Sequence, residues 1–154
     1  MFFEHKKLYR SVKGLVPDNY YTLPIGKAAH AAFGHDISII TYGWGVHWAL
    51  DYCTAHTISA DIIDLRTLLP WDKETVEASV KMTGKVLVLH EDTLTGGIGA
   101  EIAAWIAENC FQYLDAPVKR VGGLDTPVPL ALNLEEDFLA SARLGDAIED
   151  LLSY

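Results

Sequence analysis

The stretch "LHEDTLTGGIGAEIAAWI" (residues 89–106) passes from an apolar strand, through acidic residues and glycines, into a helix. This order is typical of α/β proteins, in which the turn often holds a phosphate or a dinucleotide. Gly97 and Gly99 are not followed by the third glycine of a dinucleotide fingerprint, and no P-loop ending occurs. Glu91, Asp92 and Glu101 would also repel a phosphate. The glycines therefore indicate a tight strand-to-helix turn.

Strands and helices alternate on both sides of this stretch. The pattern predicts strands over residues 28–33, 37–43, 60–66, 85–91 and 118–123, and helices over 44–56, 72–84, 99–114 and 134–152. Such alternation requires crossovers between parallel strands, with helices on both faces of the sheet. We expect a three-layer α/β/α domain with a mostly parallel sheet, to which the irregular N-terminal third adds an antiparallel edge strand.

Composition limits the kind of partner. The chain has 154 residues and a formal net charge of −9, which argues against nucleic acid or an anionic membrane as a partner. The charge is compatible with solubility alone or with a basic protein partner. No apolar run approaches the ~20 residues that a membrane span needs, and no signal peptide opens the chain. Two cysteines in apolar surroundings suit a reduced, cytoplasmic protein.

Residues that could carry chemistry do not assemble into a motif. Cys53 and His56 have the spacing of half a metal site, but a second pair of ligands is missing. There is no nucleophile elbow, and neither Cys53 nor Cys110 has an activating cation nearby in the sequence. We therefore expect no catalytic, cofactor-binding or metal-binding residues, so an interaction or assembly domain is favoured over an independent enzyme.

The pairs His90–Glu91 and Phe2–Phe3 are the remaining unusual features of the sequence. His90 and Glu91 fall at the carboxyl end of a predicted strand, where α/β domains place ligands, and an interface or a capping role is favoured for them. Phe2 and Phe3 resemble the end of a strand whose neighbours are missing.

Several segments, in order, resemble the C-terminal half of the beta subunit of thiamine-diphosphate-dependent 2-oxo acid dehydrogenases. They are "FFEHKKLYR" (2–10), "LPIGKA" (23–28), "IDLRTLLPWDKETVEASVKMTGK" (63–85), "HEDTLTGGIGAEIAAWI" (90–106) and "CFQYLDAPVKRVGGLDTPVP" (110–129), with the closing helix. The resemblance covers nearly the whole chain. The branched-chain (2-oxoisovalerate) type is favoured over the pyruvate type.

The resemblance implies a transketolase C-terminal domain over residues 23–154, with a five-stranded mixed sheet and one antiparallel edge strand. Residues 1–22 would be a linker remnant from the preceding pyrimidine-binding domain. In the family, thiamine diphosphate and Mg²⁺ are held by groups upstream of this segment or in the alpha subunit, so none is assigned here. We expect this chain alone to be inactive and to bind no thiamine diphosphate.

The resemblance also implies partners: the alpha subunit, a second beta subunit, and the basic peripheral subunit-binding domain of the acyltransferase, which a charge of −9 would attract. The candidate interface residues are His90, Glu91, Leu94, Thr95, Gly96, Asp125, Thr126 and Pro127. For the last three, a proline-fixed turn is an equally good interpretation.

Three alternatives stay open. The domain could come from a pyruvate dehydrogenase beta subunit, or it could be a stand-alone α/β interaction module with no catalytic parent. Transketolase and deoxyxylulose-phosphate synthase share the domain but match "LRTLLPWD" (65–72) and "LTGG" (94–97) less fully.

Overall fold

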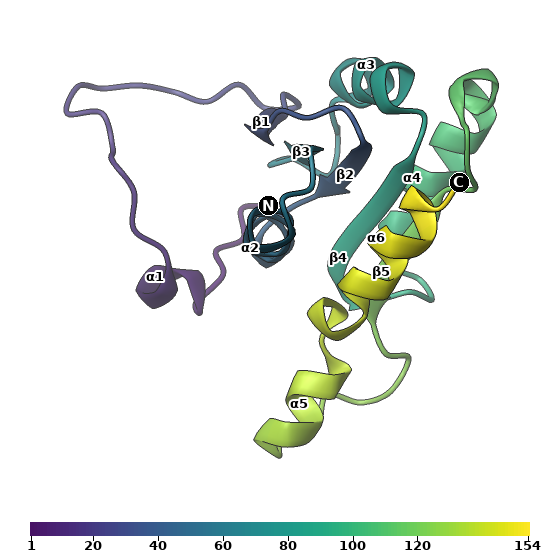
Figure 1. The fold of residues 1–154 in the computed structure, drawn as a ribbon. Coiled ribbons are helices and arrows are strands. Elements are labelled where there is room, and N and C mark those ends of the chain that lie inside the picture. The colour runs from purple at the N-terminus through teal and green to yellow at the C-terminus, as the bar shows by residue number, and fades with distance from the viewer.

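In the computed structural model, which describes residues 1–154, a five-stranded sheet lies between two layers of helices (Figure 1). The strands are β1 (Ala29–Ala32), β2 (Ile37–Thr41), β3 (Ala60–Asp64), β4 (Val86–Thr93) and β5 (Lys119–Gly123). Their order in the sheet is β1-β3-β2-β4-β5, and only β1 runs antiparallel to its neighbour. The predicted three-layer mixed sheet with an antiparallel edge strand is confirmed.

The four longer helices, α2, α3, α4 and α6, divide between the two faces of the sheet. They are α1 (Leu8–Ser11), α2 (Trp44–His56), α3 (Lys73–Thr83), α4 (Gly99–Asn109), α5 (Leu132–Phe138) and α6 (Leu144–Leu152), with 3-10 turns η1 (Phe111–Tyr113) and η2 (Ala140–Arg143). Helices α2 and α6 pack with Ile39 and Ile62, whereas α3 and α4 pack with Ile40 and Ile63. Successive strand residues point to opposite faces, so β2 and β3 place isoleucines on both faces, and the buried Ser38 and Asp61 lie on the face that α3 covers, where both contact the Ser79 hydroxyl. None of the helices is both long and apolar enough to cross a membrane.

The two cysteines fall on opposite faces of the sheet. Cys53 packs in the cluster beneath α2 and α6, and Cys110 packs in the cluster beneath α3 and α4. Both thiols are free and buried. The sheet separates them, as expected for two core residues in different layers.

Helix α3 shows how local sequence sets an element's limits. The Asp72 carboxylate accepts a hydrogen bond from the Thr75 N–H at 3.2 Å and caps the helix, and Gly84 ends it with a φ of 67°. The other Asp72 oxygen accepts from the Ala28 N–H at 3.0 Å, which fixes the start of β1 to α3. Burial acts to raise the pKa of Asp72, but these hydrogen bonds and nearby Lys27 outweigh it and lower the pKa.

Two predicted helices end differently in the structure. The helix predicted over 134–152 is interrupted: Leu139 is extended (ψ 147°), and η2 separates α5 from α6. The Arg143 guanidinium donates to the carbonyls of Gly122, Asp137 and Phe138, which stabilises this break. The helix predicted over 99–114 stops at Asn109, and a 3-10 turn follows.

The strands also differ slightly from their predicted limits. Strand β4 continues to Thr93, because Thr93 pairs with Gly123 of β5. Phe2 and Phe3 form no strand, and they are 95% and 83% exposed. Residues 12–25 run outward from the body in an extended path (Figure 1). The chain is anchored again where the Gly26 N–H donates to the Thr67 hydroxyl at 3.1 Å.

Candidate functional site

The carboxyl ends of β2 and β4 lie at the topological switch point of the sheet, where the crossover connections change direction. The chain passes from β2 to β3 on one side, and β4 then lies on the other side of β2. Open α/β sheets bind ligands at such a reversal. A groove of about 420 Å³ opens there, lined by Tyr42, Glu91, Asp92, Thr93, Thr126, Val128, Glu135, Phe138 and Leu139. The groove brings the predicted segments 90–96 and 125–127 together.

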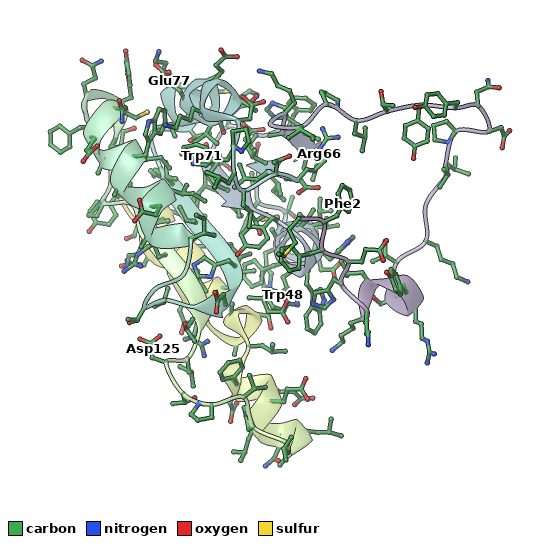
Figure 2. The ribbon with its side chains drawn as sticks, turned by 180° about the vertical axis from the view of Figure 1, so that it is seen from behind. Phe2, Trp48, Arg66, Trp71, Glu77 and Asp125 are labelled. Atoms are coloured by element: carbon green, nitrogen blue, oxygen red, sulfur yellow. The ribbon has the colours of Figure 1, made fainter.

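Hydrogen bonds join these two segments directly. The Asp125 carboxylate accepts from the Thr95 N–H at 3.1 Å and from the Thr95 hydroxyl at 2.5 Å. The Arg120 guanidinium donates to the Leu94 carbonyl at 3.1 Å. Because Asp125 accepts these hydrogen bonds from Thr95, its pKa lies below the ordinary value. Figure 2 shows Asp125 at the end of the molecule that carries α5.

His90 lies beneath this surface and presents no atom to it. The side chain is 0% exposed, and its Nδ1 lies 2.9 Å from the Asp92 carbonyl. Burial lowers the pKa of His90, so the ring is neutral and Nδ1–H donates to that carbonyl. Nε2 is buried without a hydrogen-bond partner.

Three glycines make room for the His90 ring. A Cβ atom at Gly99 would overlap Nε2, and Cβ atoms at Gly97 and Gly122 would come within 2.9 Å and 3.0 Å of Cε1. Gly97 and Gly99 of the "TGGIG" segment (95–99) therefore accommodate a side chain of the same molecule. This agrees with the tight strand-to-helix turn predicted from the sequence.

The other candidates lie at or near the surface. Thr95, Gly96, Asp125, Thr126 and Pro127 are exposed. Leu94 and Glu91 are half-buried. Glu91 pairs with His5, whose Nε2 lies 2.8 Å from Glu91 Oε2.

Sequence reasoning missed several groove residues. Tyr42 directly follows β2. It could have been predicted from the sequence, because the carboxyl ends of neighbouring parallel strands lie together and ligands bind there. No sequence signal pointed to His5 or Glu135, because their positions depend on how the terminal segments pack.

The groove is electrically negative. The pKa of Tyr42 is raised to about 12. Burial of the side chain is the largest cause, and the nearby carboxylates of Asp92 and Glu91 add to it. The Tyr42 hydroxyl is therefore protonated at neutral pH and cannot act as a nucleophile. The groove combines apolar walls with the acidic side chains of Glu91, Asp92 and Glu135 and has no basic residue in its lining.

Nothing in the chain is arranged to hold a metal ion or an activated thiol. No group of three or more His, Cys, Asp and Glu side chains could coordinate a metal. His56 stacks on Tyr52, with ring centroids 4.2 Å apart, while Cys53 points to the core. Burial raises the pKa of Cys53 to about 11, which keeps it a thiol.

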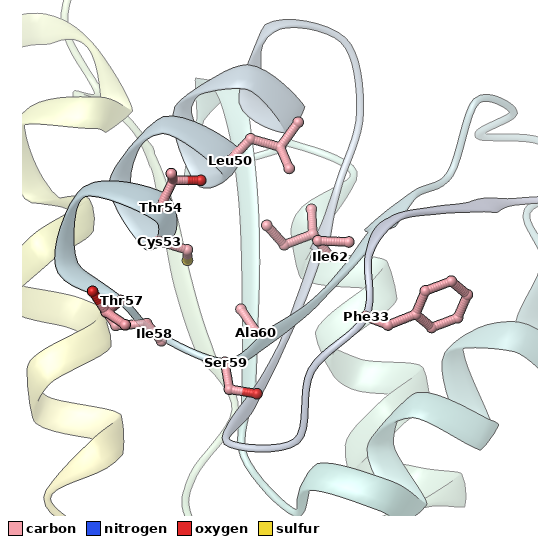
Figure 3. Close-up of a pocket in the computed structure, with 10 residues that line it drawn as sticks. Phe33, Leu50, Cys53, Thr54, Thr57, Ile58, Ser59, Ala60 and Ile62 are labelled. Carbon is pink, nitrogen blue, oxygen red and sulfur yellow. The ribbon is translucent and has the colours of Figure 1, made fainter.

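A second cavity, of about 360 Å³, lies between α2 and the β1 edge (Figure 3). Its walls are mainly apolar, with Leu50, Cys53, Ile58 and Ile62 among them. Cys53 is the only titratable group in this lining, and the cavity shares no residue with the groove. It lies apart from all the predicted interface residues.

Comparison with known proteins defines the class. The family model "Transketolase, C-terminal domain" matches residues 26–143, and the chain belongs to this family. Among individual relatives, it is 48% identical to the 2-oxoisovalerate dehydrogenase subunit beta of Bacillus subtilis over 145 residues, covering 92% of this chain and 44% of the relative. It is 45% identical to the mitochondrial 2-oxoisovalerate dehydrogenase subunit beta 2 of Arabidopsis thaliana, covering 100% of this chain and 44% of the relative. The resemblance stated from the sequence is confirmed.

A pyruvate dehydrogenase subunit and a solved transketolase structure are also similar to this chain. The chain is 41% identical to the pyruvate dehydrogenase E1 component subunit beta of Mycoplasma pneumoniae, covering 99% of this chain and 47% of the relative. The solved structure "Split gene transketolase, inactive beta4 tetramer" matches with a TM-score of 0.73 and 25% identity, over 92% of this chain and 46% of that one. The chain thus spans about half the length of the curated relatives it matches.

Proposed function

We propose that this chain is the C-terminal assembly domain of the decarboxylating component of a 2-oxo acid dehydrogenase complex. The parent enzyme would oxidatively decarboxylate a branched-chain 2-oxo acid and pass the acyl group to a lipoyl arm. The observation that carries this proposal is the 48% identity to a 2-oxoisovalerate dehydrogenase beta subunit over 92% of the chain. A pyruvate dehydrogenase beta subunit is the second candidate, supported by the 41% identity over 99% of the chain.

Thiamine diphosphate and Mg²⁺ belong, in this proposal, to the parent enzyme and not to this domain. The geometry supports that assignment: His90 fills the glycine turn, and no acidic or histidine cluster could hold a metal. This domain would contribute protein contacts. We expect no decarboxylase activity from the chain alone.

The proposed partners are the alpha subunit, a second beta subunit and the basic peripheral subunit-binding domain of the acyltransferase. The negative groove and the exposed loops at Thr95 and Asp125 support contact with a basic surface. The acidic groove and the exposed loops are also the reason to assign Glu91, Leu94 and Thr126 to an interface, together with the adjacent Thr95, Gly96, Asp125 and Pro127. Burial limits His90 to supporting the loop from below.

Two sequence-based expectations stay predictions. The first is the boundary between a linker at residues 1–22 and the domain at 23–154. The second is a cytoplasmic location, since the relatives from Arabidopsis thaliana and Dictyostelium discoideum are named as mitochondrial.

Calorimetry tests the assembly role. Titration of a peripheral subunit-binding domain into this chain is expected to show binding that weakens as salt rises, because the attraction is electrostatic. The double variant Glu91→Lys/Asp92→Lys should weaken that binding. The double variant Asp51→Lys/Glu108→Lys changes the net charge equally at exposed positions outside the groove, and should bind nearly as the parent chain does. Absent or salt-insensitive binding would count against the role.

A second titration tests the cofactor assignment. Thiamine diphosphate with Mg²⁺ should produce no binding heat with this chain. Micromolar binding would overturn the assignment of the cofactor to the rest of the enzyme.

A further inference from the structure

His90 is a buried titratable side chain that the proposed function does not use. Its ring is 0% exposed and neutral, with Nδ1–H donating to the Asp92 carbonyl and Nε2 lacking a hydrogen-bond partner. Cβ atoms at Gly97, Gly99 and Gly122 would all come too close to the ring. The ring therefore fills a pocket, called here the glycine pocket, that these three glycines leave open.

The surroundings of Nε2 make a positive charge on the ring costly. Gly99 is the first residue of α4, and the free N–H groups of a helix N-terminus give that end a partial positive charge. A proton on Nε2 would place an N–H donor against this end of the helix, where the structure offers it no hydrogen-bond partner. A buried donor without an acceptor is costly, and so is a charge beside another of the same sign. The ring is therefore stable in the glycine pocket only while it is neutral.

Charged and titratable groups surround His90 on each element that packs against it. They are Glu91 and Asp92 on β4, Tyr42 after β2, Arg120 on β5, Glu101 in the first turn of α4 and Arg143 in η2. Burial is the largest influence on the pKa of His90 and lowers it. The hydrogen bond to the Asp92 carbonyl and the Asp92 carboxylate act to raise the pKa, and the Arg120 charge acts to lower it. The net direction is downward from the ordinary value of about 6.5.

The loop that covers the glycine pocket, residues 94–98, has few buried contacts. From outside, the Thr95 N–H and hydroxyl donate to Asp125, and Arg120 donates to the first carbonyl of the loop. Gly97 is the only residue of the loop that is buried, and it has no side chain. A segment with so little buried apolar area opens at a low cost in free energy. The loop can therefore open while the sheet stays folded.

We propose that His90 is a pH-sensitive switch for the loop of residues 94–98. At neutral pH the neutral ring fills the glycine pocket and the loop is closed. In acid, the ring leaves the pocket, Nε2 takes up a proton from water, and the loop opens to let the ring out. Thr95 and Gly96 are candidate interface residues, so acid would change the surface that the loop presents. The switch would operate in this domain whatever the parent enzyme is.

Proton uptake sets the size and direction of the effect. The ring has a lower pKa in the closed state than in the open state, so the open state binds the proton more tightly. The open fraction should rise about tenfold for each pH unit below about 6.5, until the pKa of the closed state is reached. The pKa of Asp125 is lowered, so its carboxylate stays ionised at pH values above its ordinary value of about 3.9. Protonation of Asp125 therefore does not open the loop in this range.

Nuclear magnetic resonance of the whole chain between about pH 7.5 and pH 5 tests the switch. The ring nitrogen signals of His90 report its charge, and the Thr95 amide reports the loop. Protection of the Thr95 amide against hydrogen exchange should fall about tenfold for each pH unit below about 6.5. Low urea should not change this protection, because opening the loop exposes little surface. The amide signals of Ile39 and Leu87 should still show a folded sheet at the lowest pH.

The variant His90→Asn keeps an N–H donor for the Asp92 carbonyl but takes up no proton in this range, so its Thr95 protection should not depend on pH. His56→Asn, at an exposed position, should keep the dependence of the parent chain. A loop that still responds to pH in His90→Asn would overturn the switch. So would a parent chain in which the His90 ring becomes charged while Thr95 keeps its protection.

Loss of the Ile39 and Leu87 signals at the same pH as the Thr95 protection would show global unfolding, and would also overturn the switch. If His90→Asn does not fold, the ring signals and the Thr95 exchange of the parent chain decide the question by themselves. None of these measurements involves an acyltransferase or a second subunit. Failure of the switch and failure of the assembly function are therefore distinguishable.

Discussion

Asp125 accepts two hydrogen bonds from Thr95, one from the backbone N–H at 3.1 Å and one from the hydroxyl at 2.5 Å. The two residues are 30 positions apart in the sequence, and each lies in the loop that follows a parallel strand. A carboxylate that accepts two donors at once fixes both loops relative to the sheet. The shape of the exposed surface therefore depends on one ionised side chain.

Replacing Asp125 with Asn should loosen that contact, because an amide offers one acceptor oxygen where the carboxylate offers two. Hydrogen exchange of the Thr95 amide should become faster, while exchange in the β4 core stays unchanged. The Asp125 pKa is lowered in the folded state, so the contact is present above the unfolded value of about 3.9 and is lost as pH falls through the folded pKa. Asp51→Asn, at an exposed position of α2, is the control. Unchanged Thr95 exchange in Asp125→Asn would contradict the role.

Gly99→Ala should destabilise the fold, because the added Cβ overlaps the buried His90 ring. Overpacking of this kind costs about 1–3 kcal/mol, which corresponds to a Tm lower by ~2–4 °C for each kcal/mol. Gly14→Ala, where the Cβ meets nothing within 4 Å, should leave Tm unchanged. In the double variant Gly99→Ala/His90→Ala, removal of the ring relieves the overlap, so the loss should be smaller than the sum of the two single losses. Additive losses would mean that the two residues do not clash.

The free energy of unfolding should decrease as the pH drops below about 6.5, partly because of His90. Burial lowers the pKa of His90 in the folded state, so the unfolded chain binds a proton that the folded chain does not. The free energy of unfolding then decreases as pH falls below the unfolded value of about 6.5, by at most about 1.4 kcal/mol per pH unit from this group. Urea denaturation between pH 5 and 8 should show a shallower slope for His90→Asn than for the parent chain. His56→Asn, at an exposed position, should keep the parent slope.

Arg143→Ala should release α5 from the sheet. Its guanidinium donates to the carbonyls of Asp137, Gly122 and Phe138 at 2.8, 2.8 and 3.0 Å. Loss of a charged donor to partly buried carbonyls costs about 2 kcal/mol, and limited proteolysis should cut the chain near α5 sooner. Arg10→Ala, on exposed α1, provides the control. Equal cleavage rates in the two variants would show that Arg143 does not hold α5.

The sheet could be predicted because its central strands carry β-branched apolar residues on both faces and short turns separate them from the helices. Ile37–Thr41 and Ala60–Asp64 carry this signal plainly, and the Asp72 cap and the Gly84 stop mark α3. The closing segment could not be divided from sequence, because 134–152 has helical composition throughout. Its break at Leu139 depends on Arg143 reaching carbonyls of β5 and α5.

The candidate interface was partly predictable. Parallel strands have their carboxyl ends at the same end of the sheet. The strand pattern alone therefore places Glu91 and Thr95, at the end of one strand, near Asp125, at the end of another. That His90 turns inward could not be foreseen, since it depends on Gly122 of the neighbouring strand making room for the ring. The contribution of His5 depends on where an exposed segment folds back, which no local pattern encodes.

The placement of Cys53 and Cys110 on opposite faces of the sheet gives each helical layer its own thiol. Cys110 is 0% exposed, so a thiol reagent can reach it only after the layer of α3 and α4 opens, whereas Cys53 lines the cavity between α2 and β1 and is open to a small reagent sooner. Labelling of Cys110 under mild denaturant would therefore report the opening of its layer, with no engineered probe.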